Sequence, residues 1–91
     1  MNWRTLEYAL AVHETRSFRA AAQRCHASTP TVSLQVRKLE GYLRTPLFER
    51  DTHGVRTTPQ GERIMLDIRR AVQAVRAMRR DAMVLALEEI E

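Results

Sequence analysis

Small, hydroxylated and cationic side chains gather in one short segment of the chain, residues 28–38. At about 100° per residue, they share one face of a helix and its flanks. The members are Thr29, Pro30, Thr31, Ser33, Leu34, Arg37 and Lys38. Hydroxyl groups donate and accept hydrogen bonds, and guanidinium groups bind phosphate or base edges. Such a face suits contact with a phosphate-lined groove, so the chemistry it offers is recognition of a polyanion.

Two helices joined by a tight turn are predicted to position this face. An alanine-rich helix begins after Ser17, and a second helix begins after a short break at its cap, Ser28. Pro30 lies in the first turn of this second helix, where a missing N–H costs nothing. The opposite, apolar stripe of that helix has spacings of 4, 3 and 4 and consists of Val32, Val36, Leu39 and Leu43. The pattern predicts a helix-turn-helix, whose second helix can enter the major groove of DNA.

The flanking segments complete a mainly helical fold. A first helix is expected from about Trp3 to Thr15. Two short runs, residues 47–50 and 55–58, flank the turn-forming segment 51–54 and therefore predict a hairpin. Three helices followed by such a two-stranded wing form a winged helix-turn-helix.

The last helix carries an unbroken heptad stripe. It begins at the cap-then-proline pair Thr58-Pro59 and continues to about Glu88. Its apolar residues recur with gaps of 4 and 3, and they are Ile64, Ile68, Ala71, Val75, Met78, Ala82 and Leu85. A stripe of this kind predicts pairing with a second copy of the helix. We therefore expect two units, a DNA-binding winged helix-turn-helix over residues 1–58 and a linker helix for dimerisation over residues 59–91.

Composition bounds the class of protein. The 91 residues allow one small domain, for which a partner chain is a reasonable expectation. The formal net charge of +4 is carried by residues 1–58, whereas the charges of residues 59–91 cancel. Nearly all the cations are arginine, which suits phosphate and guanine recognition and equally fits a GC-rich genome.

The sequence also argues against several other classes of protein. A single cysteine excludes an internal disulfide, and no signal peptide or membrane span is predicted, so we expect a soluble protein of the reducing cytoplasm. Cys25, His26 and His53 offer three potential zinc ligands without a fourth, and we expect neither a metal nor another cofactor. The chain has no Ser/His/Asp arrangement, phosphate-binding glycine loop or carboxylate pair in an apolar setting, and so does not resemble an enzyme.

A series of short motifs follows in order along nearly the whole chain. They are Leu6-Glu7-Tyr8, Ala11-Val12, Ser17-Phe18, Ala21-Ala22, Ser28-x-Pro30-x-x-Ser33, Leu39-Glu40, Pro46-Leu47-Phe48-Glu49-Arg50 and Thr58-x-x-Gly61-Glu62. In this combination the chain resembles the N-terminal DNA-binding domain of LysR-type transcriptional regulators. Cys25-His26 and the run from Val36 to Glu40 further resemble the peroxide-sensing OxyR branch of that family.

The resemblance implies partners as well as a fold. Members of the family bind double-stranded promoter DNA as homodimers, and two dimers often assemble into a tetramer in the full-length protein. A small-molecule effector acts only through a separate domain after the linker helix. That domain would begin near Glu91, and we expect it to be absent from this chain.

The resemblance also suggests which residues contact DNA. Base reading is assigned to Thr29, Pro30, Ser33 and Leu34, with His53 at the tip of the wing. Candidates for phosphate contact are Arg19, Ser28, Thr31, Arg37, Lys38, Arg50 and Arg56, and any one of the arginines can instead be a solvated surface charge.

The chain departs from the common family pattern at three of these positions. The family often has glutamine at position 29, arginine at position 34 and arginine at the wing tip, where this chain has Thr29, Leu34 and His53. Bidentate readout of adenine or guanine is therefore not available at Thr29 or Leu34. Leu34 is either a DNA contact or an exposed or dimer-facing leucine, and His53 is either a groove contact or a plain surface histidine. A winged helix that binds an acidic protein instead of DNA is the alternative function.

Overall fold

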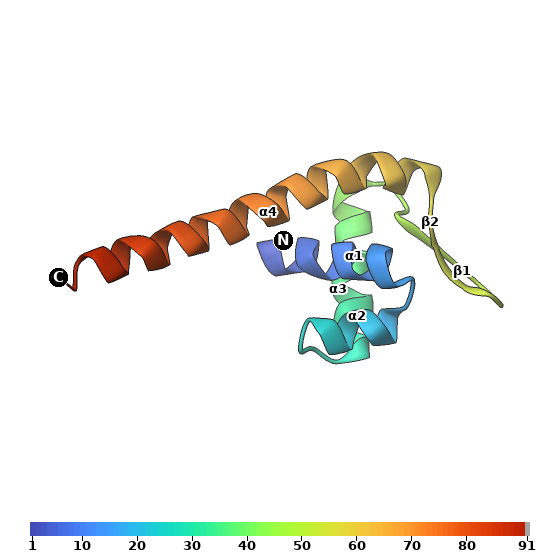
Figure 1. Ribbon diagram of the computed structural model, residues 1–91. Coiled ribbons are helices and arrows are strands. Elements are labelled where there is room, and N and C mark those ends of the chain that lie inside the picture. Colours follow the sequence, from blue (N-terminus) through green and yellow to red (C-terminus); the bar gives the residue numbers. More distant parts are fainter. Residues whose placement is uncertain (91) are drawn as a thin grey trace.

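The computed structural model describes residues 1–90, which form four helices and one antiparallel hairpin (Figure 1). In chain order the elements are α1 (Trp3–Thr15), α2 (Phe18–Arg24), α3 (Thr29–Leu43), β1 (Phe48–Asp51), β2 (Gly54–Thr57) and α4 (Pro59–Glu88). The predicted winged helix-turn-helix with a long last helix is confirmed. Each strand lies one residue nearer to the tip than expected, because Leu47 is buried in the core and Thr58 caps α4.

Each helix begins at a side chain that accepts a backbone N–H from three residues further along. These caps are Asn2, Ser17, Ser28 and Thr58. A cap of this kind contributes about 1 kcal/mol to stability. The caps therefore fix where the helices start and, for α3, which side chains face outward.

The turn between α2 and α3 depends on one residue with left-handed backbone. His26 has a φ of 55°, and the N–H of Ala27 donates to the carbonyl of Ala22 at 2.9 Å. This is the Schellman arrangement, in which glycine is usual, although histidine is among the residues that tolerate it. The turn reverses the chain and leaves the first residues of α3 exposed.

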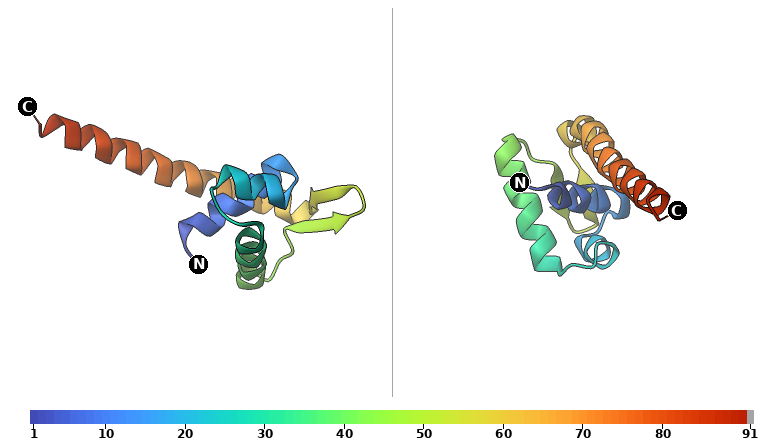
Figure 2. Two further views of the ribbon diagram at one scale, coloured as in Figure 1. Left: turned by 90° about the horizontal axis from the view of Figure 1, so that it is seen from below. Right: turned by 90° about the vertical axis from the view of Figure 1, so that its left-hand side faces the viewer.

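Helix α1 lies at the centre of the body, in contact with α2, α3 and α4. Two directions of view show α3 crossing α1 steeply (Figures 1 and 2). The largest fully enclosed side chains come from α1, α3, α4 and the segment before β1, and they are Val12, Val32, Val36, Leu39, Leu47, Met65 and Val72. The predicted apolar stripe of α3 is thus buried, which turns the opposite face of that helix toward solvent.

The first half of α4 belongs to the same core. This half runs antiparallel to α1 (Figure 1), and its buried residues are Gly61, Met65, Ile68 and Val72. Ile68 keeps only 4% of its surface exposed within the single chain, and Ile64 is partly buried against the core. The expectation that Ile68 lies in a dimer interface is corrected by this placement. The heptad pattern misled because the core-facing stripe and the heptad stripe adjoin on the helix surface.

The second half of α4 leaves the body of the molecule. Figures 1 and 2 show it projecting well beyond the other helices, and the chain measures 56 × 24 × 19 Å along its principal axes. Exposed apolar side chains line this half, including Met78, Val84 and Leu85. None of the helices in the described part of the chain has the length and apolar character that a membrane crossing requires.

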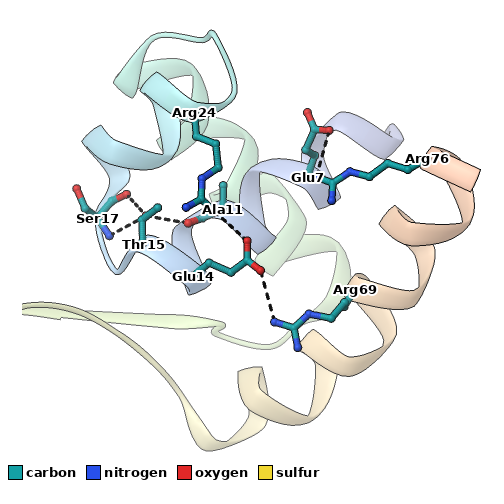
Figure 3. Close-up of polar contacts among 8 residues, drawn as sticks. All are labelled: Glu7, Ala11, Glu14, Thr15, Ser17, Arg24, Arg69 and Arg76. Carbon is teal, nitrogen blue, oxygen red and sulfur yellow. Dashed lines mark hydrogen bonds and ion pairs between the residues drawn. The ribbon is translucent and has the colours of Figure 1, made fainter. Parts of the chain in front are cut away.

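Ion pairs join α4 and α2 to α1 (Figure 3). Glu14 lies 2.9 Å from Arg24 of α2 and 3.7 Å from Arg69 of α4, and Glu7 lies 3.9 Å from Arg76 of α4. A single exposed ion pair contributes little to stability. Here, however, two acids of α1 pair with three arginines of α2 and α4. These contacts set the direction in which α4 leaves the core.

Candidate nucleic-acid interface

The candidate interface begins at the exposed start of α3. Thr29, Pro30 and Leu34 are exposed there and Ser33 is half-buried, so the four side chains of α3 that are predicted to read bases lie on its outward face. Leu34 exposes 50% of its surface. An outward apolar side chain beside small polar ones can contact a thymine methyl group in a major groove.

The N-terminus of α3 is organised by a pair of hydroxyl groups. Ser28 accepts the backbone N–H of Thr31 at 3.2 Å and donates its own proton to the Thr31 hydroxyl at 2.7 Å. The first N–H groups of a helix favour anions, because they carry the positive end of the helix dipole. The geometry is compatible with a phosphate near the predicted contacts Ser28 and Thr31.

Arg50 of β1 reaches from the wing to the outward face of α3. Its guanidinium lies 3.9 Å from the centroid of the Phe18 ring, and a terminal nitrogen donates to the Ser33 hydroxyl at 3.1 Å. Phe18 in turn packs edge-on against Phe48, with the ring centroids 6.1 Å apart. The structure therefore joins a residue predicted to contact phosphate with one predicted to read a base.

The root of the wing is tied to α3 by Glu40. Its carboxylate accepts the backbone N–H of Leu47 at 2.7 Å and that of Phe48 at 3.3 Å. On the other strand, His13 of α1 and the hydroxyl of Thr57 share a hydrogen bond of 2.7 Å. Both strands are thus attached to the helical body, which fixes the wing beside α3.

The tip of the wing is a short turn. Asp51 accepts the backbone N–H of His53 at 2.7 Å, and Gly54 has a φ of 117°, a conformation that L side chains rarely adopt. His53 is exposed at this tip. Arg56 lies 3.3 Å from Asp51 and is also paired with Glu49, so its charge is partly neutralised within the wing.

Residues 3–62 match the family model described as bacterial regulatory helix-turn-helix protein, lysR family. The chain belongs to the LysR family. The DNA-binding transcriptional dual regulator OxyR of Escherichia coli K12 is 42% identical over 79 residues, which are 87% of this chain and 26% of that protein. TfdS of Cupriavidus pinatubonensis is 41% identical over 73 residues, 80% of this chain and 25% of that protein. The LysR-family chain thus spans about a quarter of the length of these relatives, and OxyR is scarcely more similar to it than TfdS is.

A solved structure extends the similarity to three dimensions. The complex of the BenM DNA-binding domain with catB site 1 DNA has a TM-score of 0.85 and 32% identity, covering 94% of this chain and 97% of that one. The likeness therefore includes the projecting part of α4 as well as the helix-turn-helix.

Charge is unevenly distributed over this LysR-family domain. Arg19, Arg37 and Lys38 are exposed, and none of them has an ion-pair partner within residues 1–90. The acids of α1 are instead paired with Arg24, Arg69 and Arg76, as described above. Unpaired cations near α3 can bind phosphates at no cost of breaking internal pairs.

Cys25 lies away from this face, in the core at the end of α2. Burial raises the pKa of its thiol above the ordinary value of 9.0, and the charge of Glu7 acts in the same direction. The thiol is therefore held in its protonated, less reactive form. Of the three side chains weighed as metal ligands, Cys25 is buried and the adjacent His26 lies in an exposed turn. His53 lies at the wing tip.

Several of the residues that shape the interface had no predicted role in its geometry. Glu40 belongs to a quoted motif, but its hydrogen bonds to the wing join residues seven and eight positions apart in sequence. The stacking of Arg50 on Phe18 links residues far apart in sequence. No periodicity marks such contacts, and only the ordered LysR motifs included these residues at all.

Proposed function

We propose that this chain is the sequence-specific DNA-binding module of a bacterial LysR-type transcriptional regulator. The observation that carries the proposal is the outward face of α3, where Thr29, Pro30, Ser33 and Leu34 lie exposed or half-exposed above a buried apolar stripe. Helix α3 enters the major groove and the wing lies near the minor groove. The similarity to a LysR DNA-binding domain in complex with DNA supports this docking mode.

The proposed contacts fall into two groups. Thr29, Pro30, Ser33 and Leu34 contact base edges, and His53 approaches the minor groove. The phosphate contacts are Arg19, Ser28, Thr31, Arg37, Lys38, Arg50 and Arg56. Among these, Arg56 makes the weakest contact, because Glu49 and Asp51 already hold its guanidinium.

The module acts as a homodimer in this proposal. The dimer stripe comprises Ile64, Ala71, Val75, Met78, Ala82 and Leu85, of which Met78 and Leu85 expose 63% and 60% of their surfaces. A helix that presents such a stripe to water gains by pairing with a second copy. Residues 1–58 together with the first half of α4 form the DNA-binding unit, and the second half of α4 is the linker.

The wider setting follows from the relatives. Their greater length supports a full protein with an effector domain besides this module, and we propose that the full protein assembles as a tetramer on promoter DNA. Such a protein works in the bacterial cytoplasm, bound to the nucleoid.

Binding of duplex DNA at several salt concentrations tests the proposal. The probe is the duplex that lies upstream of the chain's own gene, with a scrambled duplex of equal length as reference. We expect preference for the upstream duplex and an affinity that falls steeply with salt, because phosphate contacts release counterions. Ser33→Trp should remove the preference yet leave salt-dependent, non-specific binding, whereas Gln73→Trp on the exposed side of α4 should preserve both. Absence of any DNA binding at low salt would refute the proposal and favour an acidic protein partner.

A further inference from the structure

The hydroxyl of Ser33 is constrained before any DNA arrives. A terminal nitrogen of Arg50 lies 3.1 Å from its oxygen. A guanidinium has donors only, so the serine oxygen accepts in this contact. The hydroxyl hydrogen therefore points away from Arg50 and is available to donate.

Arg50 itself is held by groups that do not depend on DNA. Its guanidinium stacks 3.9 Å from the centroid of Phe18, a buried ring supported edge-on by Phe48. Glu40 binds the backbone of Phe48, and this anchors the start of the strand that carries Arg50. Stacking and anchoring together place the positive charge beside Ser33 in the free protein.

Every base pair of DNA presents one keto oxygen and one amino group near the centre of the major groove, and the sequence decides which strand carries which. On a given strand, guanine and thymine present keto oxygens, which accept, whereas adenine and cytosine present amino groups, which donate. An unconstrained serine contacts either kind. A serine beside a guanidinium is different, because an amino group approaching its oxygen meets a second set of donors and a positive charge.

We propose that Arg50 makes Ser33 a hydrogen-bond donor and thereby selects keto bases over amino bases at the position that Ser33 faces. The inference rests on the proposed function and adds to it a specificity rule and a positioning role for Arg50. The other nitrogens of Arg50 remain available for phosphate.

Enrichment of duplexes from a randomised pool tests the rule and requires no defined operator sequence. The wild-type chain, Ser33→Ala, Arg50→Met and Arg63→Met are each carried through the same rounds of selection. The position whose base preference disappears in Ser33→Ala is the one that Ser33 faces. Arg63→Met is the matched control, since it removes the same charge from an exposed position of α4 that has no assigned DNA contact.

We expect guanine and thymine to exceed adenine and cytosine about fivefold at that position with the wild-type chain, the size of one net hydrogen bond. Arg50→Met should bring the ratio close to one, and Arg63→Met should leave it unchanged. An unaltered ratio in Arg50→Met, or an excess of amino bases with the wild-type chain, overturns the inference while leaving the proposed function intact. A wild-type chain that enriches no motif at low salt refutes the proposed function instead. Circular dichroism of each variant establishes that the fold is retained, and the wild-type ratio tests the rule even if Arg50→Met unfolds.

Discussion

Glu40 and Leu47 are joined by a hydrogen bond of 2.7 Å between the carboxylate of α3 and the first backbone N–H after the turn into the wing. The same carboxylate also accepts the N–H of Phe48. One side chain of α3 therefore holds the first strand of the wing, while His13 of α1 holds the second through Thr57.

Removal of this carboxylate should loosen the wing. Glu40→Ala leaves two backbone N–H groups without their acceptor, and we expect the free energy of unfolding to fall by about 2 kcal/mol. Glu40→Gln should lose less, because its amide oxygen still accepts. Urea denaturation measures both changes, with Glu49→Ala as the control for an exposed acid. Equal and small losses in all three variants would show that Glu40 does not anchor the wing.

Replacement of two glycines by alanine should change the stability of the fold in opposite directions. A Cβ at Gly61 would lie 2.5 Å from the carbonyl oxygen of Leu47, so Gly61→Ala should destabilise the fold by about 2 kcal/mol or more. Gly41 has no neighbour within 4 Å of such a Cβ, and Gly41→Ala should stabilise α3 by about 0.5–1 kcal/mol. Thermal unfolding of the two variants distinguishes these signs. A stabilised Gly61→Ala variant would contradict the close approach of α4 to the root of the wing.

Charged substitutions in α4 should separate dimerisation from folding. Val75→Glu and Met78→Glu place charge in the dimer stripe, at a half-buried and an exposed position respectively, and we expect each to weaken self-association at least about tenfold, as sedimentation at several concentrations would measure. Gln73→Glu, on another exposed side of the helix, should not. Ile68→Asp should unfold the chain itself, because Ile68 is buried in its own core. A wild-type chain that stays monomeric at high concentration would refute the pairing.

The thiol of Cys25 should be protected in the folded chain. Burial and the raised pKa both reduce the thiolate that alkylating reagents attack, so iodoacetamide should react more than about tenfold faster after denaturation in urea. Because the folded pKa lies above its ordinary value of 9.0, the thiol stabilises the fold fully below pH 9 and this contribution falls as the pH rises above it. In Cys25→Ala, the free energy of unfolding should fall less over this pH range. Equal alkylation rates of folded and unfolded chain would contradict the buried position.

Local rules were sufficient to predict most of the fold. The caps Ser17, Ser28 and Thr58 mark helix starts by their own chemistry, and the spacing of Val32, Val36 and Leu39 determines which face of α3 is buried. Those two facts place Thr29, Pro30 and Ser33 outward, whatever the tertiary packing of the other helices.

Contacts between distant segments were beyond such rules. The heptad stripe of α4 included Ile68, but packing against α1 uses an adjoining stripe that also contains Met65 and Val72, and periodicity alone cannot rank two overlapping faces. The left-handed turn at His26 was equally hidden, since glycine is the residue that usually signals it.

Helix α4 runs without a break from the core to its exposed end, so its projecting half forms a rigid arm attached to the domain. The half of α4 that projects from the body, about 15 residues at about 1.5 Å each, makes a rigid arm of about 22 Å. A tilt of about 10° at the root of this arm moves its far end by about 4 Å. Such a tilt would act on α1, which contacts α4 and is paired with it through Arg69 and Arg76, and α1 in turn contacts the helix that faces DNA.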